Sequence, residues 1–149
     1  MKRLQQIVGE EVGVGSTAKV FAIDDKKVAK VYKESIPDEE YLKNEFSIMN
    51  YLHEKGFPVP KPYCLSEVVV EGKVRKALIM ERVYGELGDS VFDEKFIENF
   101  DLLKEYWQDK ALKAGVKLYD FGVQNVIVRD LENEDVVIID FADAELFIK

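Results

Sequence analysis

The residues with the clearest chemical potential lie near the C-terminus, where an aspartate, an asparagine five residues later and a second aspartate follow one another. They are Asp120, Asn125 and Asp140, and the last of them closes the apolar run 136–139. Carboxylate and amide oxygens are hard ligands of the kind that suits magnesium. The spacing of the first two residues is a weak signal by itself, so residues elsewhere in the chain must decide what these three do.

A lysine and a glutamate in apolar surroundings are a second pair of residues with chemical potential. Lys30 lies between apolar neighbours in an expected strand, where a solvated surface charge is a poor explanation. Glu45 lies on the apolar face of an expected helix, where a carboxylate is costly to bury unless a cation pairs with it. We predict that these two residues form an ion pair, although a glutamate at the rim of the face would fit the pattern equally well. Three other lysines offer competing registers: Lys26, Lys27 and Lys33.

Alternating apolar residues and glycine-containing turns predict the sheet that carries the lysine. Residues roughly 6 to 33 alternate like a hairpin followed by a third strand, with turns at 12–15 and 24–27. Two more strands, about 64–70 and 74–82, are joined by a short glycine turn. We therefore expect a five-stranded antiparallel sheet.

Apolar residues at helical spacing predict two long helices. The first begins near the capping hydroxyl of Ser35 and runs to about Glu54, so it carries the glutamate described above. The second runs from 93 to 114 and is ended by a glycine. Two short strands, 126–128 and 136–139, follow the second helix and lead into the C-terminal residues.

The composition of the 149 residues fits one domain with one core, since 47% of them are hydrophobic. The net charge of −8 disfavours nucleic acid and anionic membrane surfaces, because both reward clustered Lys and Arg. No apolar stretch approaches a membrane span, and the N-terminal residues lack a secretory signal, so we expect a cytoplasmic protein. A single cysteine, Cys64, and a single histidine, His53, exclude an internal disulfide and a His-rich metal site.

The order of these elements and motifs resembles the protein-kinase-like superfamily over nearly the whole chain. Gly13 and Gly15, followed by Ser16, resemble the kinase glycine-rich loop. Lys30 resembles the strand lysine that binds the α and β phosphates, and Glu45 resembles the helix glutamate that pairs with it. The resemblance implies an α+β protein-kinase-like fold with a five-stranded antiparallel N-lobe sheet, one αC-type helix and a minimal helical C-lobe.

The resemblance also implies one domain over residues 1–149, with the N-lobe and hinge in 1–83 and the minimal C-lobe in 84–149. It implies that the chain binds ATP and Mg²⁺. Val28 would cover the adenine, while the Glu81 carbonyl and the Val83 amide would read the edge of the base. The residues implied to bind the nucleotide are Gly13, Gly15, Ser16, Val28, Lys30, Met80, Glu81 and Val83.

By the same resemblance, the C-terminal residues act on the acceptor and on the metal. Asp120 would accept the proton of an acceptor hydroxyl. Asn125 and Asp140 would hold magnesium, which offsets charge on the transferred phosphoryl group. The implied catalytic residues are Asp120, Lys30 and Glu45. The run 120–122 also spells the kinase metal-binding triplet, but that register leaves no upstream aspartate and asparagine at the required spacing.

The chain departs from the family pattern at several positions. Leu118 replaces a histidine that braces the catalytic loop, Gly122 replaces a lysine near the γ-phosphate, and Ala142 replaces the glycine of the metal-binding triplet. Lys19 or Arg129 could supply the missing cation. Nine residues follow the second aspartate, so the peptide-docking helices of protein kinases are not expected. In this the chain resembles the minimal kinase-like proteins of bacteria and phages.

The function that we expect is ATP- and Mg²⁺-dependent transfer of the γ-phosphate to a hydroxyl, with a protein as the acceptor and no nucleic acid involved. A pseudokinase that binds nucleotide in order to regulate a partner is an alternative, favoured by the departures above. Retention of Asp120 argues against a pseudokinase, since a binding module does not need that residue. A small-molecule kinase is a third possibility, for which the short C-terminus leaves little room for an acceptor pocket.

Overall fold

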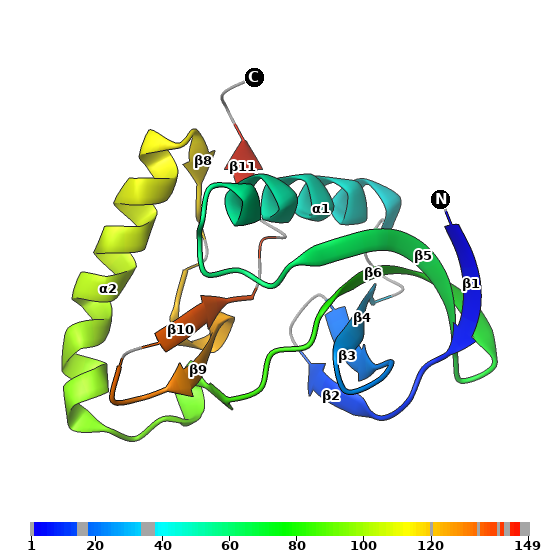
Figure 1. Cartoon of the computed structure of the whole chain (residues 1–149), viewed down its shortest axis with the longest axis horizontal. Helices are drawn as coiled ribbons and strands as arrows, with labels where there is room; N and C mark the ends of the chain where they lie inside the picture. Colours follow the sequence, from blue (N-terminus) through cyan, green and yellow to red (C-terminus); the bar gives the residue numbers. More distant parts are fainter. Residues whose placement is uncertain are drawn as a thin grey trace. The chain divides into compact units, whose positions relative to one another are not determined.

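The chain forms two compact units, as a computed structural model shows (Figure 1). Unit 1 comprises Met1–Asn50 and Pro60–Arg82, and unit 2 comprises Tyr51–Val59 and Val83–Lys149. The structure describes residues 2–14, 18–33, 38–119, 121–133, 135–139, 141 and 144–146.

Unit 1 is built on a six-stranded sheet with the order β1-β5-β6-β4-β3-β2. Its strands are β1 (Lys2–Ile7), β2 (Glu11–Val14), β3 (Ala18–Ala22), β4 (Lys27–Tyr32), β5 (Pro62–Val70) and β6 (Lys73–Glu81). All neighbouring pairs from β5 to β2 are antiparallel. The expected five-stranded antiparallel sheet is therefore confirmed, and the glycine turn between β5 and β6 contains Glu71 and Gly72, both with positive φ.

The N-terminal part of the sheet differs from the expectation. The alternation that begins near residue 6 predicted a single strand, but the chain forms β1, which pairs in parallel with β5, and then the separate β2. The two strands are separated at Gly9, whose N–H donates to the Ala22 carbonyl at 2.7 Å. The turn expected at 12–15 was also placed too early, because β2 continues to Val14. The turn before β4 is confirmed, with Asp24 accepting from two backbone N–H groups.

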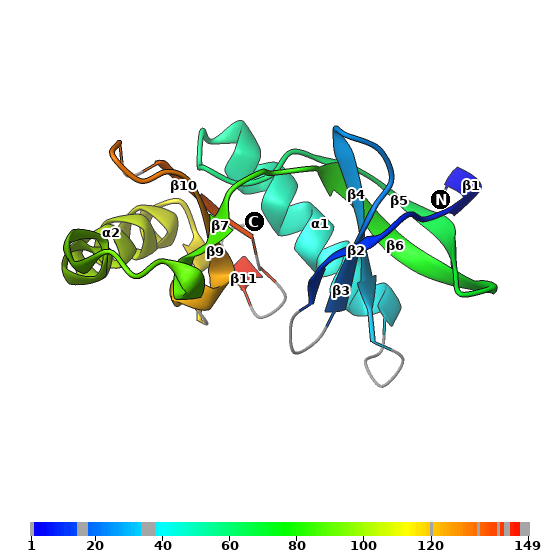
Figure 2. The same ribbon diagram turned by 90° about the horizontal axis from the view of Figure 1, so that it is seen from below.

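Helix α1 (Asp38–Glu54) ends where the sequence predicted, and it lies along the sheet of unit 1 in two perpendicular views (Figure 1 and Figure 2). Its buried positions Leu42, Glu45 and Met49 recur at helical spacing. The expected capping residue Ser35 lies outside the described residues. The other face of the sheet carries a second apolar cluster of Phe21, Ala29, Val31, Val68, Ala77 and Ile79. Because side chains alternate along a strand, Lys30 is directed away from this cluster.

Unit 2 contains helix α2 (Glu94–Lys113), which has the extent that the sequence predicted. The Asp93 side chain caps its N-terminus, and Gly115 follows its C-terminus with a φ of 94°. The three-stranded sheet of this unit has the order β10-β9-β7. Strands β8 and β11 form a separate two-stranded sheet. The strands are β7 (Glu86–Leu87), β8 (Val116–Lys117), β9 (Val126–Asp130), β10 (Asp135–Ile138) and β11 (Glu145–Leu146), with 3-10 turns η1 (Gly88–Ser90) and η2 (Val123–Asn125).

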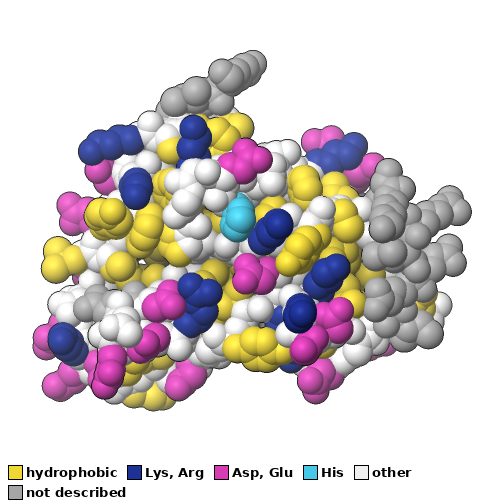
Figure 3. Space-filling view, in the orientation of Figure 1, with side chains coloured by type: hydrophobic (Ala, Val, Ile, Leu, Met, Phe, Trp, Pro, Cys, Tyr) yellow, Lys and Arg dark blue, Asp and Glu magenta, His cyan; other side chains and the backbone are white. Residues whose placement is uncertain are grey.

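Charged residues of both signs are interspersed over the face of the molecule shown in Figure 3. This distribution agrees with the absence of a basic run in the sequence. Neither α1 nor α2, the long helices of the described residues, is apolar enough to cross a membrane.

Candidate functional site

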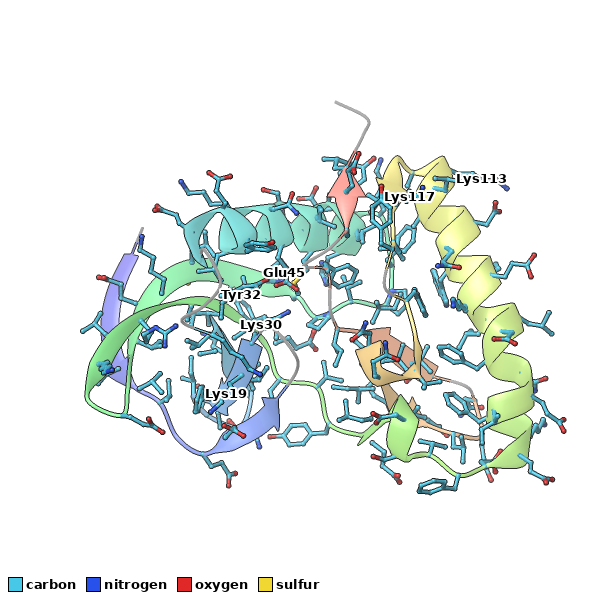
Figure 4. All side chains as sticks on the ribbon, turned by 180° about the vertical axis from the view of Figure 1, so that it is seen from behind. Lys19, Lys30, Tyr32, Glu45, Lys113 and Lys117 are labelled. Carbon is cyan, nitrogen blue, oxygen red and sulfur yellow. The ribbon has the colours of Figure 1, made fainter. Side chains whose placement is uncertain are left out.

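The predicted ion pair between Lys30 and Glu45 is present in unit 1. The Lys30 ammonium donates to Glu45 Oε2 at 2.7 Å, which joins β4 to α1 (Figure 4). The exposed fraction is 5% for Lys30 and 0% for Glu45. Isolation from water strengthens the attraction between the two charges and makes either charge costly alone. The lysine of this buried pair is therefore Lys30 and not Lys26, Lys27 or Lys33, and Glu45 does not lie at the rim of the apolar face.

A tyrosine that the sequence analysis did not single out completes this group. Tyr32 is fully buried, and its hydroxyl donates to Oε1 of Glu45, while Lys30 donates to Oε2. Tyr32 follows Lys30 by two residues on β4, so both side chains are on the same face of the strand. Figure 4 shows the three side chains converging between β4 and α1. The sequence could have indicated this contact only through the spacing of two residues between Lys30 and Tyr32 on one strand. A tyrosine in an apolar strand is, however, equally well explained as a core residue.

The residues expected around an adenine lie on neighbouring strands of unit 1. Val28 on β4 is paired directly with Met80 on β6, and both are buried. Val28 and Lys30 share one face of β4, as the alternation predicted. Glu81 ends β6, where its N–H donates to the Lys61 carbonyl at 2.9 Å. Val83 lies beyond the strand and belongs to unit 2.

The glycine-rich segment is described only in part. Gly13 lies in β2 opposite Val20, while Gly15 and Ser16 lie outside the described residues. A Cβ at Gly13 would lie 3.6 Å from the Val20 Cβ, an ordinary contact. The sheet itself therefore does not require glycine at this position.

The predicted metal ligands of unit 2 come from neighbouring parts of the chain. Asn125 is buried at the end of η2, where its N–H donates to the Gly122 carbonyl at 3.0 Å. Its own carbonyl accepts from the Ile139 N–H at 2.9 Å. The backbone of Asn125 is thus hydrogen-bonded to Ile139, which precedes Asp140 in sequence. Asp140 itself, like Asp120, lies outside the described residues. An amide oxygen and a carboxylate are ligands of the kind that Mg²⁺ prefers.

The described residues of unit 2 contain no cluster of three or more His, Cys, Asp or Glu side chains that could hold a metal ion. Asp120, Asp140 and Asp143 lie outside the described residues, so this absence does not extend to them. Mg²⁺ is usually held by one or two protein ligands together with a nucleotide.

Packing supports the loop that carries Asp120. Leu118 and Phe121, which flank it in sequence, are both buried. The Phe121 ring lies 6.1 Å from the ring of Phe100 on α2, and the Gln108 side chain donates to the Leu118 carbonyl at 3.3 Å. These contacts agree with the expectation that packing replaces the missing histidine at position 118.

The side chain of Gln124 covers Gly122 and was not anticipated. A Cβ at Gly122 would lie 2.3 Å from Gln124 Oε1, so a larger residue here would displace that side chain. The two cations proposed to compensate for the missing lysine already have carboxylate partners. Lys19 Nζ lies 3.7 Å from Glu11 Oε1, and Arg129 Nη2 lies 3.0 Å from Asp135 Oδ1.

The residue before Asp120 has a perturbed acidity. The Tyr119 hydroxyl donates to Glu145 Oε2 on β11 at 3.2 Å, and this hydrogen bond raises the pKa of Tyr119 above its ordinary value. The Lys117 ammonium lies 4.9 Å from the centre of the Tyr119 ring. The tyrosine hydroxyl therefore stays protonated at neutral pH, and it ties the start of the loop to β11.

The antiparallel sheet, the helix that carries a paired glutamate and the asparagine beside the end of an apolar strand together define the protein-kinase-like fold. Solved structures with this fold match nearly the whole chain. A Rio2 kinase from Chaetomium thermophilum, in a complex with ADP, Mg²⁺ and phosphoaspartate, superimposes with a TM-score of 0.67 at 22% identity, covering 94% of this chain and 49% of that chain. WbdD, in a co-crystal with the kinase inhibitor LY294002, gives a TM-score of 0.62 at 19% identity over 90% of this chain and 32% of that chain.

A likeness in sequence points in the same direction. The serine/threonine-protein kinase rio2 of Schizosaccharomyces pombe is 29% identical over an alignment of 164 positions, which covers 90% of this chain and 44% of that protein. This chain therefore spans less than half the length of that relative. No family model matches the chain. The likeness in sequence supports a kinase-like phosphotransferase family, and the solved structures show the protein-kinase-like fold.

Proposed function

We propose that the chain is an ATP- and Mg²⁺-dependent phosphotransferase that transfers the γ-phosphate of ATP to a protein hydroxyl. The observation that carries the proposal is the buried ion pair of Lys30 and Glu45 at 2.7 Å. Burying two charges brings little stability by itself, so stability alone is a weak explanation for this pair. A lysine held by a glutamate, ready to bind phosphate oxygens, is the use that kinases make of it.

The remaining residues have defined parts in this proposal. Val28 and Met80 contact the adenine, and Glu81 and Val83 bind its edge through backbone groups. Gly13, Gly15 and Ser16 allow backbone N–H groups to approach the phosphates, and the ordinary contacts that a Cβ at Gly13 would make in the sheet are consistent with a role toward ligand. Asn125 and Asp140 hold Mg²⁺. We propose that residues 1–149 form one kinase-like domain with the N-lobe and hinge in 1–83 and the minimal C-lobe in 84–149, a division that differs from the two compact units at 51–59 and at Val83.

Phosphoryl transfer breaks the bond between the γ-phosphorus of ATP and its β–γ bridging oxygen, which leaves with ADP, and forms a bond from phosphorus to the acceptor oxygen. When the acceptor is a hydroxyl, Asp120 takes its proton. Lys30, fixed by Glu45, binds the α and β phosphates and orients the γ-phosphate. Magnesium, when bound with the nucleotide, supplies positive charge that offsets the charge of the transferred group.

A second acceptor class is suggested by the Rio2 complex from Chaetomium thermophilum, which contains a phosphoaspartate. An aspartate carboxylate at pH 7 has no proton to lose, so transfer to it would not need a base. We therefore propose a side-chain carboxylate of this chain as the alternative acceptor. The two products differ chemically, because an acyl phosphate is cleaved by hydroxylamine and a phosphate ester is not.

The test is incubation of the chain with labelled ATP and Mg²⁺, alone and with a cell lysate. Asp120→Asn keeps the shape of the side chain and removes its proton-accepting charge. We expect Mg-ATP affinity to persist while transfer to a hydroxyl falls by roughly two to four orders of magnitude. Hydroxylamine treatment of the labelled product identifies the class of acceptor.

Two outcomes would contradict the proposal in different ways. Tight Mg-ATP binding with no transfer above the Asp120→Asn control would favour the pseudokinase, to which Leu118, Gly122 and Ala142 already point. Transfer to a small hydroxyl compound in place of protein would favour a small-molecule kinase. We also propose that the chain is cytoplasmic and has no nucleic acid partner. The net charge of −8 and the lack of a long apolar stretch in the sequence support this part of the proposal.

A further inference from the structure

Tyr32 combines complete burial with a polar contact to a residue of the proposed site. Its exposed fraction is 0%, and its hydroxyl donates to Glu45 Oε1. Lys30 donates to the other oxygen of the same carboxylate at 2.7 Å. Each oxygen of Glu45 therefore has its own donor, and both donors come from one face of β4.

Two donors restrict the carboxylate more than one donor does. The terminal torsion of a glutamate is broad, so a single ion pair leaves the carboxylate plane free to turn. A second donor on the other oxygen fixes that plane and with it the direction in which the lysine is held. The Tyr32 hydroxyl is thus placed to control the geometry of the ion pair through Glu45.

The rest of Tyr32 is held by contacts that do not involve its hydroxyl. Arg75 Nη2 on β6 donates to the Tyr32 carbonyl at 2.5 Å. The centres of the Tyr32 and Tyr41 rings are 5.9 Å apart, and the Lys30 ammonium lies 5.5 Å from the Tyr32 ring. A phenylalanine at position 32 would keep the backbone hydrogen bond and the ring contacts and would lose the donor to Glu45.

We propose that Tyr32 is a positioning residue, which fixes the Glu45 carboxylate so that the Lys30 ammonium is held in the orientation that binds nucleotide phosphates. The inference rests on the proposed phosphotransferase function. It does not require Tyr32 to touch the nucleotide.

The test compares Tyr32→Phe with the wild type in calorimetric binding of Mg-ATP and of adenosine and in turnover. Adenosine has no phosphates, so its affinity reports the fold and the base site alone. We expect Tyr32→Phe to lower Mg-ATP affinity and turnover by about tenfold and to leave adenosine affinity unchanged. Tyr41→Phe is the matched control, because it removes a hydroxyl from the adjacent ring and leaves both donors of Glu45 in place.

A double-mutant cycle distinguishes positioning from a direct effect. In a Glu45→Gln background the charge that the hydroxyl orients is gone, so Tyr32→Phe should change Mg-ATP affinity by less than about twofold. An equal loss in both backgrounds, or an equal loss of adenosine affinity, would overturn the inference. If the wild type binds Mg-ATP and transfers phosphate, and Tyr32→Phe has the same affinity and turnover, this inference alone is overturned. A wild type that does not bind Mg-ATP would overturn the proposed function, and this inference with it.

Discussion

At the scale of single residues, Lys30 and Glu45 are two buried charges in contact within unit 1. Each charge alone would be far too costly in this environment, and the 2.7 Å contact makes them tolerable together. The same contact makes each residue dependent on the other. By contrast, the exposed pair of Lys43 and Glu39 on α1, with Nζ 3.6 Å from Oε1, should contribute almost nothing to the free energy of unfolding.

Lys30→Met tests this dependence, because methionine keeps most of the volume and leaves the Glu45 carboxylate buried without the lysine. We expect the free energy of unfolding to fall by roughly 3 kcal/mol. The double variant Lys30→Met/Glu45→Met should regain part of this loss, since no buried charge remains. Urea denaturation measures both, with Lys43→Met as the exposed control. Additive losses in the double variant would mean that the two residues do not depend on each other.

The ion pair could be predicted from sequence because burial of a charge has a large cost with few remedies. The partner of Tyr32 could not, because a tyrosine hydroxyl is compatible with many surroundings and its donor direction is set by the tertiary placement of α1 against β4. Gln124 was missed for a similar reason, since nothing in the sequence shows that its side chain covers Gly122. Gly15, Ser16, Asp120 and Asp140 stay predictions, as they lie outside the described residues.

At the scale of elements, the ends of α2 follow directly from local chemistry. Asp93 Oδ1 accepts from the Phe96 N–H at 2.9 Å, which satisfies a donor that the first turn of a helix leaves without an intrahelical partner. The sequence predicted the extent of this helix from its apolar spacing and from Gly115, which follows its C-terminus. β1 could not be predicted in this way, because its strand conformation depends on pairing with β5, far along the chain. The two-residue strands β7, β8 and β11 are likewise set by tertiary pairing.

Asp93→Ala removes the cap of α2 and leaves the Phe96 N–H without its acceptor. We expect the free energy of unfolding to fall by about 1 kcal/mol. Asp93→Asn is the matched control, since asparagine caps helices about as well as aspartate. Thermal denaturation followed by circular dichroism compares the three proteins. Equal losses for the two variants would show that the charge of Asp93, and not its capping oxygen, is what stabilises the helix.

At the scale of the whole molecule, the net charge of −8 opposes the binding of an anionic nucleotide at long range. In our proposal, affinity for ATP therefore comes from local groups, chiefly Lys30 and a bound magnesium ion. Removal of the metal should accordingly affect nucleotide binding more strongly than it would in a basic protein.

Stabilisation by ligand provides the corresponding measurement. Mg-ATP at about one hundred times its dissociation constant should stabilise the chain by roughly 2.7 kcal/mol. We expect a higher melting temperature in a thermal shift experiment, an effect that excess EDTA cancels and that Asp140→Ala largely removes. Adenosine with and without Mg²⁺ is the control for metal effects unrelated to phosphate. The same shift with ATP in EDTA would contradict a role for the metal.

Protein synthesis delivers β1 first and β5 much later, yet the two strands lie side by side, with Lys2 opposite Ser66 and Ile7 opposite Val69 (Figure 1). The hairpin of β3 and β4 can pair as soon as both strands have left the ribosome, whereas β1 has no partner until α1 and β5 have followed. Closing so long a loop costs chain entropy before any pairing compensates for it. β1 is thus the first strand of the sheet to be made and cannot be among the first to find its place in it.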